Sequence, residues 1–272
     1  DQVWIYSLFV LPNTELSTKE SREKYKLETK KIELAYTKNK TEYKIKEFVE
    51  MVIGNSAMSK EKWVGSFVNS QCVLALHDDR LCFFILNYLK KELGIKITSL
   101  IEFLREKSSY DFPIIRNAFL RLENCALNVQ NKGESHLIKP KGYDGIPFDP
   151  PEGIFLELLS DKEKFYNEFI KLVESYLEFK NISFDKFILR DLFKFQEAIM
   201  ATPQNLPEET LELDYNWIDY FKYTFQLNEE NNSNTELKPE KIKLKIIDPS
   251  PCYGDTKKFL KIHFDIRGKP AL

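Results

Sequence analysis

The most constraining feature of the sequence is an apolar run near its beginning. Residues 3–11 are β-branched, aromatic or aliphatic at every position except Ser7. A short continuous run of such residues is typical of a strand that is buried on both faces. Strands of that kind belong mainly to parallel sheets or barrels that are covered by helices. Pro12 then ends the predicted strand, because proline has no N–H for the hydrogen-bond ladder.

A strand buried on both faces needs a neighbour along each edge. No other stretch of the 272 residues has the composition of a parallel partner, and the sequence begins with Asp1 rather than Met. We therefore expect the chain to be the later part of a longer protein. In this interpretation residues 3–11 form the last strand of a barrel or sheet to which the earlier part contributes the other strands.

Two stretches resemble a known family. Residues 6–16 read Tyr-x-Leu-x-x-Leu-Pro-Asn-Thr-Glu-Leu, and Ser-Arg-Glu-Lys-Tyr follows at 21–25. Both are similar to the last barrel strand of radical S-adenosylmethionine (SAM) enzymes, which ends Leu-Pro-Gly-Thr-x-Leu. Residues 50–59, with Trp63 after them, resemble the subset that carries a cobalamin-binding domain upstream. Asn13 stands where the family usually has Gly, an exchange that is tolerated because Asn also accepts left-handed backbone angles.

The resemblance implies that the chain is the C-terminal portion of such an enzyme, with its first strand closing a partial (β/α) barrel. In the family, the turn after this strand lies beside the adenine of SAM. The resemblance therefore places four residues, here called the wall residues, beside the adenine, which they would contact through apolar surface and backbone hydrogen bonds; they are Leu11, Pro12, Asn13 and Thr14. A turn that only closes the barrel is an equally good interpretation of these four residues.

The catalytic motifs of the family are absent from this sequence. It contains neither Cys-x-x-x-Cys-x-x-Cys, which holds a [4Fe–4S] cluster, nor the cobalamin-binding Asp-x-His-x-x-Gly. The resemblance therefore implies that SAM, the cluster and cobalamin belong to the full-length protein and that this chain alone holds none of them. Its expected partners are the upstream radical SAM and cobalamin domains and a small-molecule substrate, which it would cover. Members of the subset carry out methyl transfer or rearrangement.

Hydrophobic periodicity predicts the rest of the fold. Helical spacing from Ser59 to Gln130 predicts a bundle of helices with short connections, and two more helices are expected within 152–201. On the last of these, Phe187, Ile188, Phe195 and Ile199 are expected to face inward. Alternating residues predict antiparallel strands with one solvated face, and the strands expected are Thr210–Asp214, Ile242–Ile246 and Phe259–Ile266.

The expected fold class is thus α+β and mainly helical. A helical bundle is followed by a small antiparallel sheet, with an N-terminal strand left over from a (β/α) barrel. We expect residues 1–57 to be the end of the barrel and a connection, in which 26–46 is a solvated crossing. Residues 58–131 are expected to form a helical subdomain, and 152–272 to form helices plus the sheet. Between them, 132–151 is a loop, because residues 131–151 contain three Gly and four Pro.

Composition narrows the function classes. Forty basic residues against 42 acidic ones give no argument for nucleic-acid or membrane-surface binding. No apolar run is long enough for a membrane span. Four cysteines without close spacing predict reduced thiols in a cytoplasmic protein; they are Cys72, Cys82, Cys125 and Cys252. Three widely separated histidines predict neither a metal site nor a catalytic residue; they are His77, His136 and His263.

Two other classes of protein stay open. A non-catalytic helical interaction or scaffold module would pair its first strand within the C-terminal sheet, beside residues 259–266. A hydrolase or transferase with a site around the 131–151 loop is a third possibility, but no spacing of residues favours it. The aromatic residues of 165–225 are interpreted as core, since aromatic side chains at helical spacing usually pack inside.

Overall fold

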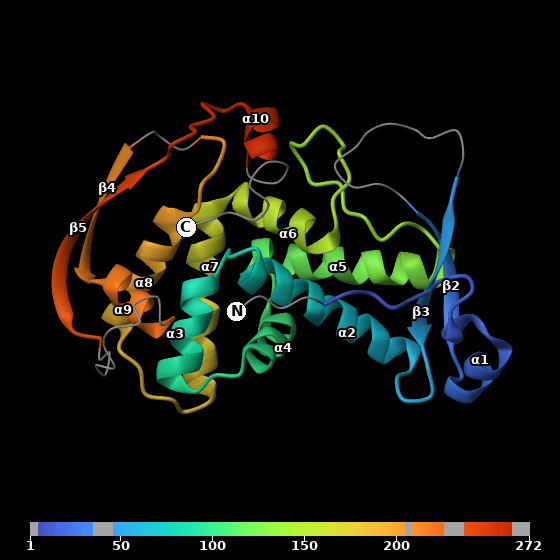
Figure 1. The fold of residues 1–272 in the computed structure, drawn as a ribbon. Helices are drawn as coiled ribbons and strands as arrows, with labels where there is room; N and C mark the ends of the chain where they lie inside the picture. Colours follow the sequence, from blue (N-terminus) through green and yellow to red (C-terminus); the bar gives the residue numbers. More distant parts are fainter. Residues whose placement is uncertain (1–4, 35–45, 205–207, 226–236, 263–272) are drawn as a thin grey trace. The chain divides into compact units, whose positions relative to one another are not determined.

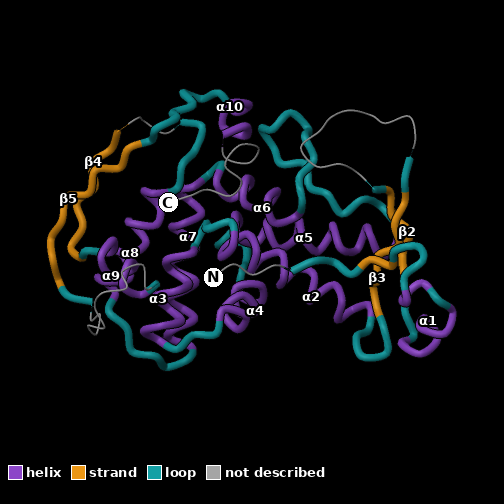
Figure 2. The backbone as a smooth tube through the Cα atoms, in the orientation of Figure 1, coloured by secondary structure: helices purple, strands orange, loops and turns teal. Residues whose placement is uncertain are grey.

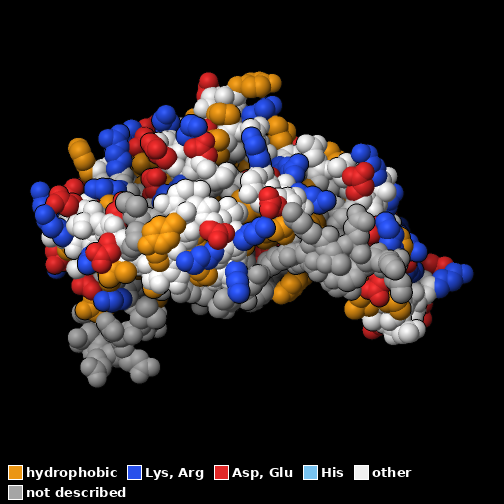
Figure 3. All heavy atoms as spheres, turned by 90° about the horizontal axis from the view of Figure 1, so that it is seen from above, with side chains coloured by type: hydrophobic (Ala, Val, Ile, Leu, Met, Phe, Trp, Pro, Cys, Tyr) orange, Lys and Arg blue, Asp and Glu red, His pale blue; other side chains and the backbone are white. Residues whose placement is uncertain are grey.

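The structure is a computed structural model, and it describes residues 5–34, 46–204, 208–225 and 237–262. Helices make up 55% of it, together with two small antiparallel sheets (Figures 1 and 2). The predicted fold class, α+β and mainly helical with a small antiparallel sheet, is confirmed. Among the described residues no helix is both long and apolar enough to cross a membrane. Lysine, arginine and acidic side chains are interspersed on the face drawn in Figure 3.

The chain divides into two compact units, residues 1–79 with 101–158 and residues 80–100 with 159–272. These units follow contacts rather than continuous stretches of sequence, and the predicted division at residues 57, 131 and 151 stays a prediction. The elements of the first unit are β1 (Phe9–Val10), α1 (Lys19–Tyr25), β2 (Glu28–Glu33), β3 (Phe48–Gly54), α2 (Lys60–Val73), a π-helical turn (Leu74–Asp78), most of α4 (Ile97–Lys107), α5 (Pro113–Lys132) and α6 (Pro150–Leu159).

The sheet of the first unit has the strand order β1-β3-β2, with antiparallel pairing on both sides of β3. Helices α2 and α5 pack against each other and against this sheet. The core they share is apolar and almost fully buried; its members are Ile32, Met51, Ile53, Trp63, Val64, Phe67, Ala126 and Val129. Ser59 begins α2 by accepting a hydrogen bond from the Lys62 amide, as its position before the apolar pattern predicts.

The prediction of a nine-residue strand buried on both faces is wrong for this chain. Of residues 5–11, which the structure describes, only Phe9 and Val10 form a strand, and β1 pairs antiparallel with β3 along one edge. Tyr6, Leu8 and Leu11 are 76%, 50% and 53% exposed. The composition of residues 3–11 is typical of a buried strand, but the described part of the chain does not bury these three side chains. The described residues contain no remnant of a barrel.

The charged stretch 26–46 was expected to be a solvated crossing, but its first part is strand β2. Ile32 is its one fully buried residue, while the flanking charged side chains stay at the surface. Gly133 at the end of α5 approaches this strand closely, since a Cβ on Gly133 would lie 2.6 Å from the Lys31 carbonyl oxygen. Residues 35–45 lie outside the described ranges.

In its described residues, the second unit contains five complete helices and the second sheet. They are α3 (Phe83–Leu93), α7 (Lys162–Phe179), α8 (Lys186–Ile199), β4 (Glu208–Tyr215), α9 (Trp217–Thr224), β5 (Pro239–Ile247) and α10 (Thr256–Leu260). Strands β4 and β5 contain the predicted strands at 210–214 and 242–246 and pair antiparallel. Ion pairs of opposite charge join their solvated faces, with Lys243 Nζ 2.7 Å from Glu212 Oε1 and Lys245 Nζ 2.9 Å from Glu208 Oε2.

Two buried polar side chains of α8 connect it by hydrogen bonds to other elements of this unit. Gln196 of α8 accepts a hydrogen bond from the Phe84 amide and donates one to the Arg80 carbonyl, which ties α8 to the start of α3. Asp191, on the same helix, accepts hydrogen bonds from two amides of β4 and from the indole Nε1 of Trp217. The aromatic residues of this unit are largely core, as predicted.

The predicted strand at Phe259–Ile266 is wrong where the structure describes it. Phe259 and Leu260 end helix α10, whose N-cap is Asp255 with its carboxylate accepting from the Lys258 amide at 3.0 Å. The Asp255 cap hydrogen-bonds to a backbone amide of the first turn of α10, and the segment is helical despite its alternating pattern of apolar and polar residues. The scaffold hypothesis placed the first strand beside this segment, but β1 pairs with β3 instead. Residues 263–272 lie outside the described ranges.

Candidate functional site

The turn that follows β1 has a defined geometry. Thr14 Oγ1 donates to the Leu11 carbonyl at 2.7 Å, and the Ser17 amide and hydroxyl both donate to the Thr14 carbonyl, at 2.9 and 2.6 Å. Asn13 has φ +62°, in the left-handed region. This is the conformation that favours Gly or Asn, so the backbone at position 13 explains why Asn is tolerated there.

All four predicted wall residues, 11–14, are exposed at the surface of the first unit. Together with Tyr6 and Leu8 they give this unit an apolar flank, defined here as Tyr6, Leu8, Leu11 and Pro12. An exposed group of large apolar side chains is typical of an interaction or ligand surface. The structure thus brings the wall residues together, and their contact with adenine stays a prediction.

A charged network holds the turn against β3. Arg22 of α1 donates through Nη1 to Glu50 Oε2 at 2.8 Å and through Nε to the Ser17 carbonyl at 3.2 Å. Thr29 Oγ1 donates to the same Glu50 oxygen at 3.0 Å. The Arg22 hydrogen bond, followed by that of Thr29, lowers the pKa of Glu50 below its ordinary value, against a partial desolvation that raises it. The sequence analysis noted Arg22 and Glu50 only as parts of two separate resembling stretches.

His136 lies in the same unit as β1. Its ring centroid is 6.4 Å from that of Phe9, and Nε2 is 3.9 Å from Asp149 Oδ1. Burial lowers the pKa of His136, and the nearby Asp149 opposes this shift only partly. The imidazole is therefore neutral at pH 7. The Cys125 thiol donates to the His136 carbonyl at 2.8 Å, which anchors the backbone of the 131–151 loop.

The four cysteines are free thiols, as predicted, and three of them are buried. Burial raises the pKa of Cys72 and of Cys125 to about 12, and it raises that of Cys82 well above its ordinary value. Iron–sulfur clusters are held by thiolates, so these protonated core thiols do not fit a cluster. Among the described residues no group of three or more His, Cys, Asp and Glu is arranged to hold a metal ion.

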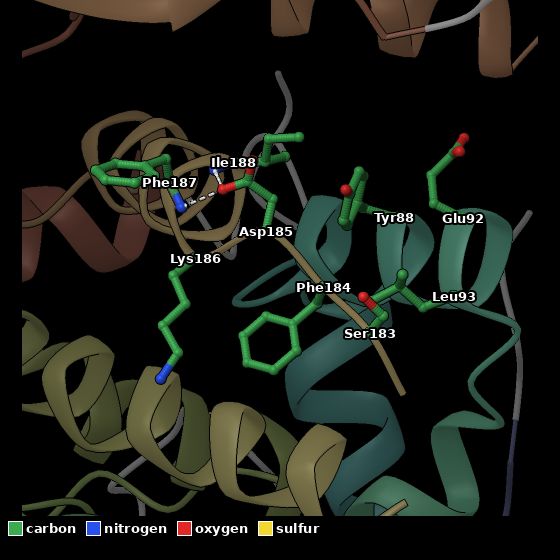
Figure 4. A pocket seen from close by; sticks show the side chains of 9 residues that line it. All are labelled: Tyr88, Glu92, Leu93, Ser183, Phe184, Asp185, Lys186, Phe187 and Ile188. Atoms are coloured by element: carbon green, nitrogen blue, oxygen red, sulfur yellow. Dashed lines mark hydrogen bonds between the residues drawn. The ribbon is translucent and has the colours of Figure 1, made fainter. Parts of the chain in front are cut away.

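The second unit has a surface pocket of about 750 Å³ between the last turns of α3 and residues 183–188, which lead into α8 (Figure 4). Its polar groups come from Tyr88 and Glu92 on α3 and from Ser183 and Asp185 before α8. Asp185 is the N-cap of α8 and accepts from the Phe187 amide at 2.7 Å. No motif or residue spacing in the sequence predicts this pocket.

The prediction that Phe187 faces inward on α8 is wrong. Phe187 is 79% exposed, whereas Phe195 is buried as predicted. Successive residues of a helix are about 100° apart, so Phe187 lies off the stripe that Ile188, Phe195 and Ile199 share. This offset was the one available sign in the sequence that Phe187 is a surface residue.

Comparison with known proteins gives two relatives, and no family model matches. The chain is 25% identical over 281 residues to the cobalamin-dependent radical SAM methyltransferase TokK of Streptomyces tokunonensis, covering 94% of this chain and 39% of TokK. It is 22% identical over 284 residues to the 2-(S-pantetheinyl)-carbapenam-3-carboxylate methyltransferase of Streptantibioticus cattleyicolor, covering 96% of this chain and 40% of that protein.

The chain thus spans about two fifths of the length of the curated relatives that it matches. These matches extend the similarity from the two short stretches at the start of the sequence to almost the whole chain. The predicted resemblance to cobalamin-binding radical SAM enzymes is confirmed: the chain is similar over nearly its entire length to two methyltransferases, one of which, TokK, is a cobalamin-dependent radical SAM enzyme.

Proposed function

We propose that this chain is the C-terminal, substrate-covering portion of a cobalamin-dependent radical SAM enzyme that transfers methyl groups. The observation that carries the proposal is the similarity of 94–96% of the chain to two methyltransferases that are each about two and a half times longer than the matched region. The sequence lacks both cofactor motifs, so the proposed role here is to cover the substrate rather than to activate SAM.

The turn at 11–14 is the proposed point of contact with SAM. Leu11 and Pro12 offer apolar surface, and the exposed, left-handed Asn13 is the position at which we propose that the backbone hydrogen-bonds to the adenine. The exposure of all four residues supports this role, because it leaves their surface accessible to a ligand. In the enzyme, SAM supplies the methyl group and the radical precursor.

The apolar flank is the proposed contact with the upstream barrel. Leu8 and Tyr6 precede the two residues that pair with β3, and their large side chains stay in solvent in the described structure. A strand contributed by the preceding domain would bury them, which would explain a composition typical of two-sided burial. The cluster is assigned to the upstream domains because the thiols of Cys72, Cys82 and Cys125 do not fit a cluster. Cobalamin is assigned there because the sequence lacks the cobalamin-binding motif. A cytoplasmic location stays a prediction.

The proposal is tested with the full-length protein that contains this chain. The protein is produced anaerobically, reconstituted with iron, sulfide and cobalamin, and supplied with SAM and a reductant. Mass spectrometry then follows 5′-deoxyadenosine, S-adenosylhomocysteine and methylated product, with 2-(S-pantetheinyl)-carbapenam-3-carboxylate as the first substrate because one relative is named for it. We expect SAM consumption that depends on cobalamin, and none with this chain alone. Cobalamin-independent products, or activity of the isolated chain, would overturn the proposal.

A further inference from the structure

The pocket of the second unit collects oxygen acceptors from two segments that are about ninety residues apart in the sequence. The Tyr88 hydroxyl and the Glu92 carboxylate come from α3, and the Asp185 carboxylate comes from the residue that begins α8. Both segments belong to the same compact unit. All three oxygens are of the kind that accept hydrogen bonds from a protonated amine.

Tyr88 is the most informative of the three. Its side chain is only 8% exposed, yet it lines the pocket, and its hydroxyl makes no hydrogen bond with a protein group among the described residues. Burial, Glu92 and Asp185 together raise the pKa of Tyr88 to about 12. The hydroxyl is therefore neutral at pH 7. The hydroxyl oxygen is not among the fully buried polar atoms that lack a partner, so it is accessible at the open side of the pocket, where a ligand or a solvent molecule can hydrogen-bond to it.

The charge of the pocket is negative. Glu92 Oε1 already accepts the Tyr220 hydroxyl at 2.6 Å and lies 3.8 Å from Lys91 Nζ, so it is partly neutralised. Asp185 accepts two backbone amides and forms no ion pair among the described residues. Lys186 also lines the pocket, and its ammonium lies 5.8 Å from the centroid of the Phe184 ring. It pairs with two acids of α7, Glu174 and Glu178, rather than with Glu92 or Asp185.

Aromatic side chains complete the site. Phe184 lines the pocket, and Phe187, at 79% exposure, stands at its rim. Aromatic faces attract cations, and they also offer apolar surface to a hydrocarbon chain. A pocket with two carboxylates, a neutral hydroxyl and two phenyl rings is suited to a cation attached to an apolar body. Its volume of about 750 Å³ lies within the range of small-molecule sites.

We propose that this pocket binds a primary alkylammonium group, held by Tyr88, Glu92 and Asp185 against the rings of Phe184 and Phe187. The binding is independent of the proposed enzymatic role, because every group it uses lies in this chain. The ammonium can belong to a free amine or to a lysine side chain, since the two share the same chemistry. Because the pocket is open to solvent, we expect weak, salt-dependent binding.

The test is a titration of the 272-residue chain, labelled with ¹⁵N, by pentylammonium. Its uncharged analogue 1-pentanol is the control ligand, and N-acetyl-lysine-amide is the arm that represents a lysine side chain. The amides of Phe187 and Ile188 are the reporters, since both donate to the Asp185 carboxylate. We expect saturable shifts of these signals with the two ammonium compounds and none that saturate with 1-pentanol. The tighter of the two ammonium ligands identifies the source of the group.

Three substitutions are matched to the geometry. Asp185→Asn keeps an N-cap of equal quality and removes only the charge, Glu92→Gln keeps the acceptor for Tyr220, and Tyr88→Phe removes only the hydroxyl. Each is expected to weaken binding by about threefold to fivefold, the size of an exposed charge interaction. Glu178→Gln, which alters a carboxylate facing Lys186 outside the pocket, should leave affinity unchanged. Equal affinity for 1-pentanol and pentylammonium, or unchanged affinity in all three pocket variants, would overturn the proposal.

Discussion

Arg22 and Glu50 link helix α1 to the central strand of the first sheet. Arg22 Nη1 donates to Glu50 Oε2 at 2.8 Å, while its Nε donates to the carbonyl of Ser17, the residue that also bonds Thr14. One guanidinium therefore connects β3 to the turn at 11–14. The planar guanidinium makes both bonds at once, which a lysine ammonium does not reproduce.

Arg22→Gln is expected to loosen the turn without touching any proposed catalytic group. In the full-length enzyme, the KM for SAM should rise severalfold while kcat changes less than about twofold, as for the loss of uniform substrate binding. Arg22→Lys should behave like Arg22→Gln, because charge alone does not hold Ser17. The measurement is steady-state formation of 5′-deoxyadenosine at varied SAM.

A matched control is Lys60→Gln, which breaks another ion pair of the same unit, that with Glu28 at 2.6 Å. It should leave the KM for SAM at the wild-type value. If the wild-type enzyme consumes SAM but Arg22→Gln matches the control, the positioning role of Arg22 is wrong while the proposed function stands. If the wild-type enzyme consumes no SAM, the proposed function itself fails.

The same pair predicts a pH dependence of stability. The pKa of Glu50 is lower in the folded chain than the ordinary value of 4.5, so its stabilising contribution is present above the unfolded pKa. That contribution is lost as the pH falls through the folded pKa. Burial raises the pKa of Glu157 and of Glu197, so these two groups change the stability with pH in the opposite direction to Glu50. The contribution of Glu50 is therefore measured as the difference in stability between wild type and Glu50→Gln.

Urea unfolding of both proteins at pH 7, 5, 4 and 3 measures that difference. Glu50→Gln should be less stable than wild type at pH 7, by under about 1 kcal/mol because the pair is partly exposed. The gap should close as the pH falls below 4. A gap that is constant from pH 7 to pH 3 would contradict the assignment.

Local signals in the sequence predicted most helices correctly. Ser59 before α2, Pro113 in the first turn of α5 and Gly94 after α3 mark helix ends by backbone chemistry that does not depend on distant contacts. The same reasoning failed for the strand at 3–11, because apolar composition reports the burial of a residue and does not name the partner that buries it. It also failed for β2, where exposed lysine and glutamate side chains hide one buried isoleucine.

The candidate sites were less predictable than the helices. The turn at 11–14 was found because its residues are contiguous and resemble a known motif. The pocket was missed because Tyr88 and Asp185 are far apart in sequence, and neither belongs to a motif. Their proximity depends on how α3 and α8 pack, through contacts such as the hydrogen bonds of Gln196, which no local pattern encodes.

Gly153 lies where α6 packs closely against the 131–151 loop, so a larger residue should not fit there. A Cβ at this position would lie 2.7 Å from Cβ of Ile138, and the backbone of Ile138 is fixed by its bridge with Phe148. Gly153→Ala should therefore lower the free energy of unfolding by about 1–3 kcal/mol, the usual cost of overpacking. Thermal and urea unfolding measure the effect.

Gly65→Ala is the control for this substitution, since its Cβ would meet only the flexible end of Arg105 at 3.3 Å. Alanine in the interior of α2 should be neutral or stabilising there. Ile138→Ala removes Cγ2, at 2.8 Å, but keeps Cβ, and it lowers stability by itself because Ile138 is buried. Gly153→Ala should therefore cost less in the Ile138→Ala background than in the wild type. A stability of Gly153→Ala equal to that of Gly65→Ala would show that α6 and the loop are not in close contact.

Asp191 is the polar centre of the second unit, and its substitution should be the most damaging of those considered. The carboxylate accepts from Trp217 Nε1 at 2.9 Å, from the Asp214 amide at 3.0 Å and from the Tyr215 amide at 3.2 Å. Trp217 is fully buried, so no solvent replaces the lost acceptor. Asp191→Ala should cost about 3 kcal/mol or more, the penalty for leaving buried donors unpaired.

Urea unfolding followed by circular dichroism measures this loss in both the wild-type and the Trp217→Phe background. Trp217→Phe separates the contribution of the indole from that of the β4 amides. Removing the indole donor along with the acceptor leaves fewer unpaired groups, so Asp191→Ala should cost less in the Trp217→Phe background than in the wild type. Asp214→Asn, an exposed acid of the same strand that faces Lys241, should change stability by under about 0.5 kcal/mol. Additive costs for Asp191→Ala and Trp217→Phe would mean that the carboxylate is held by the amides of β4 alone.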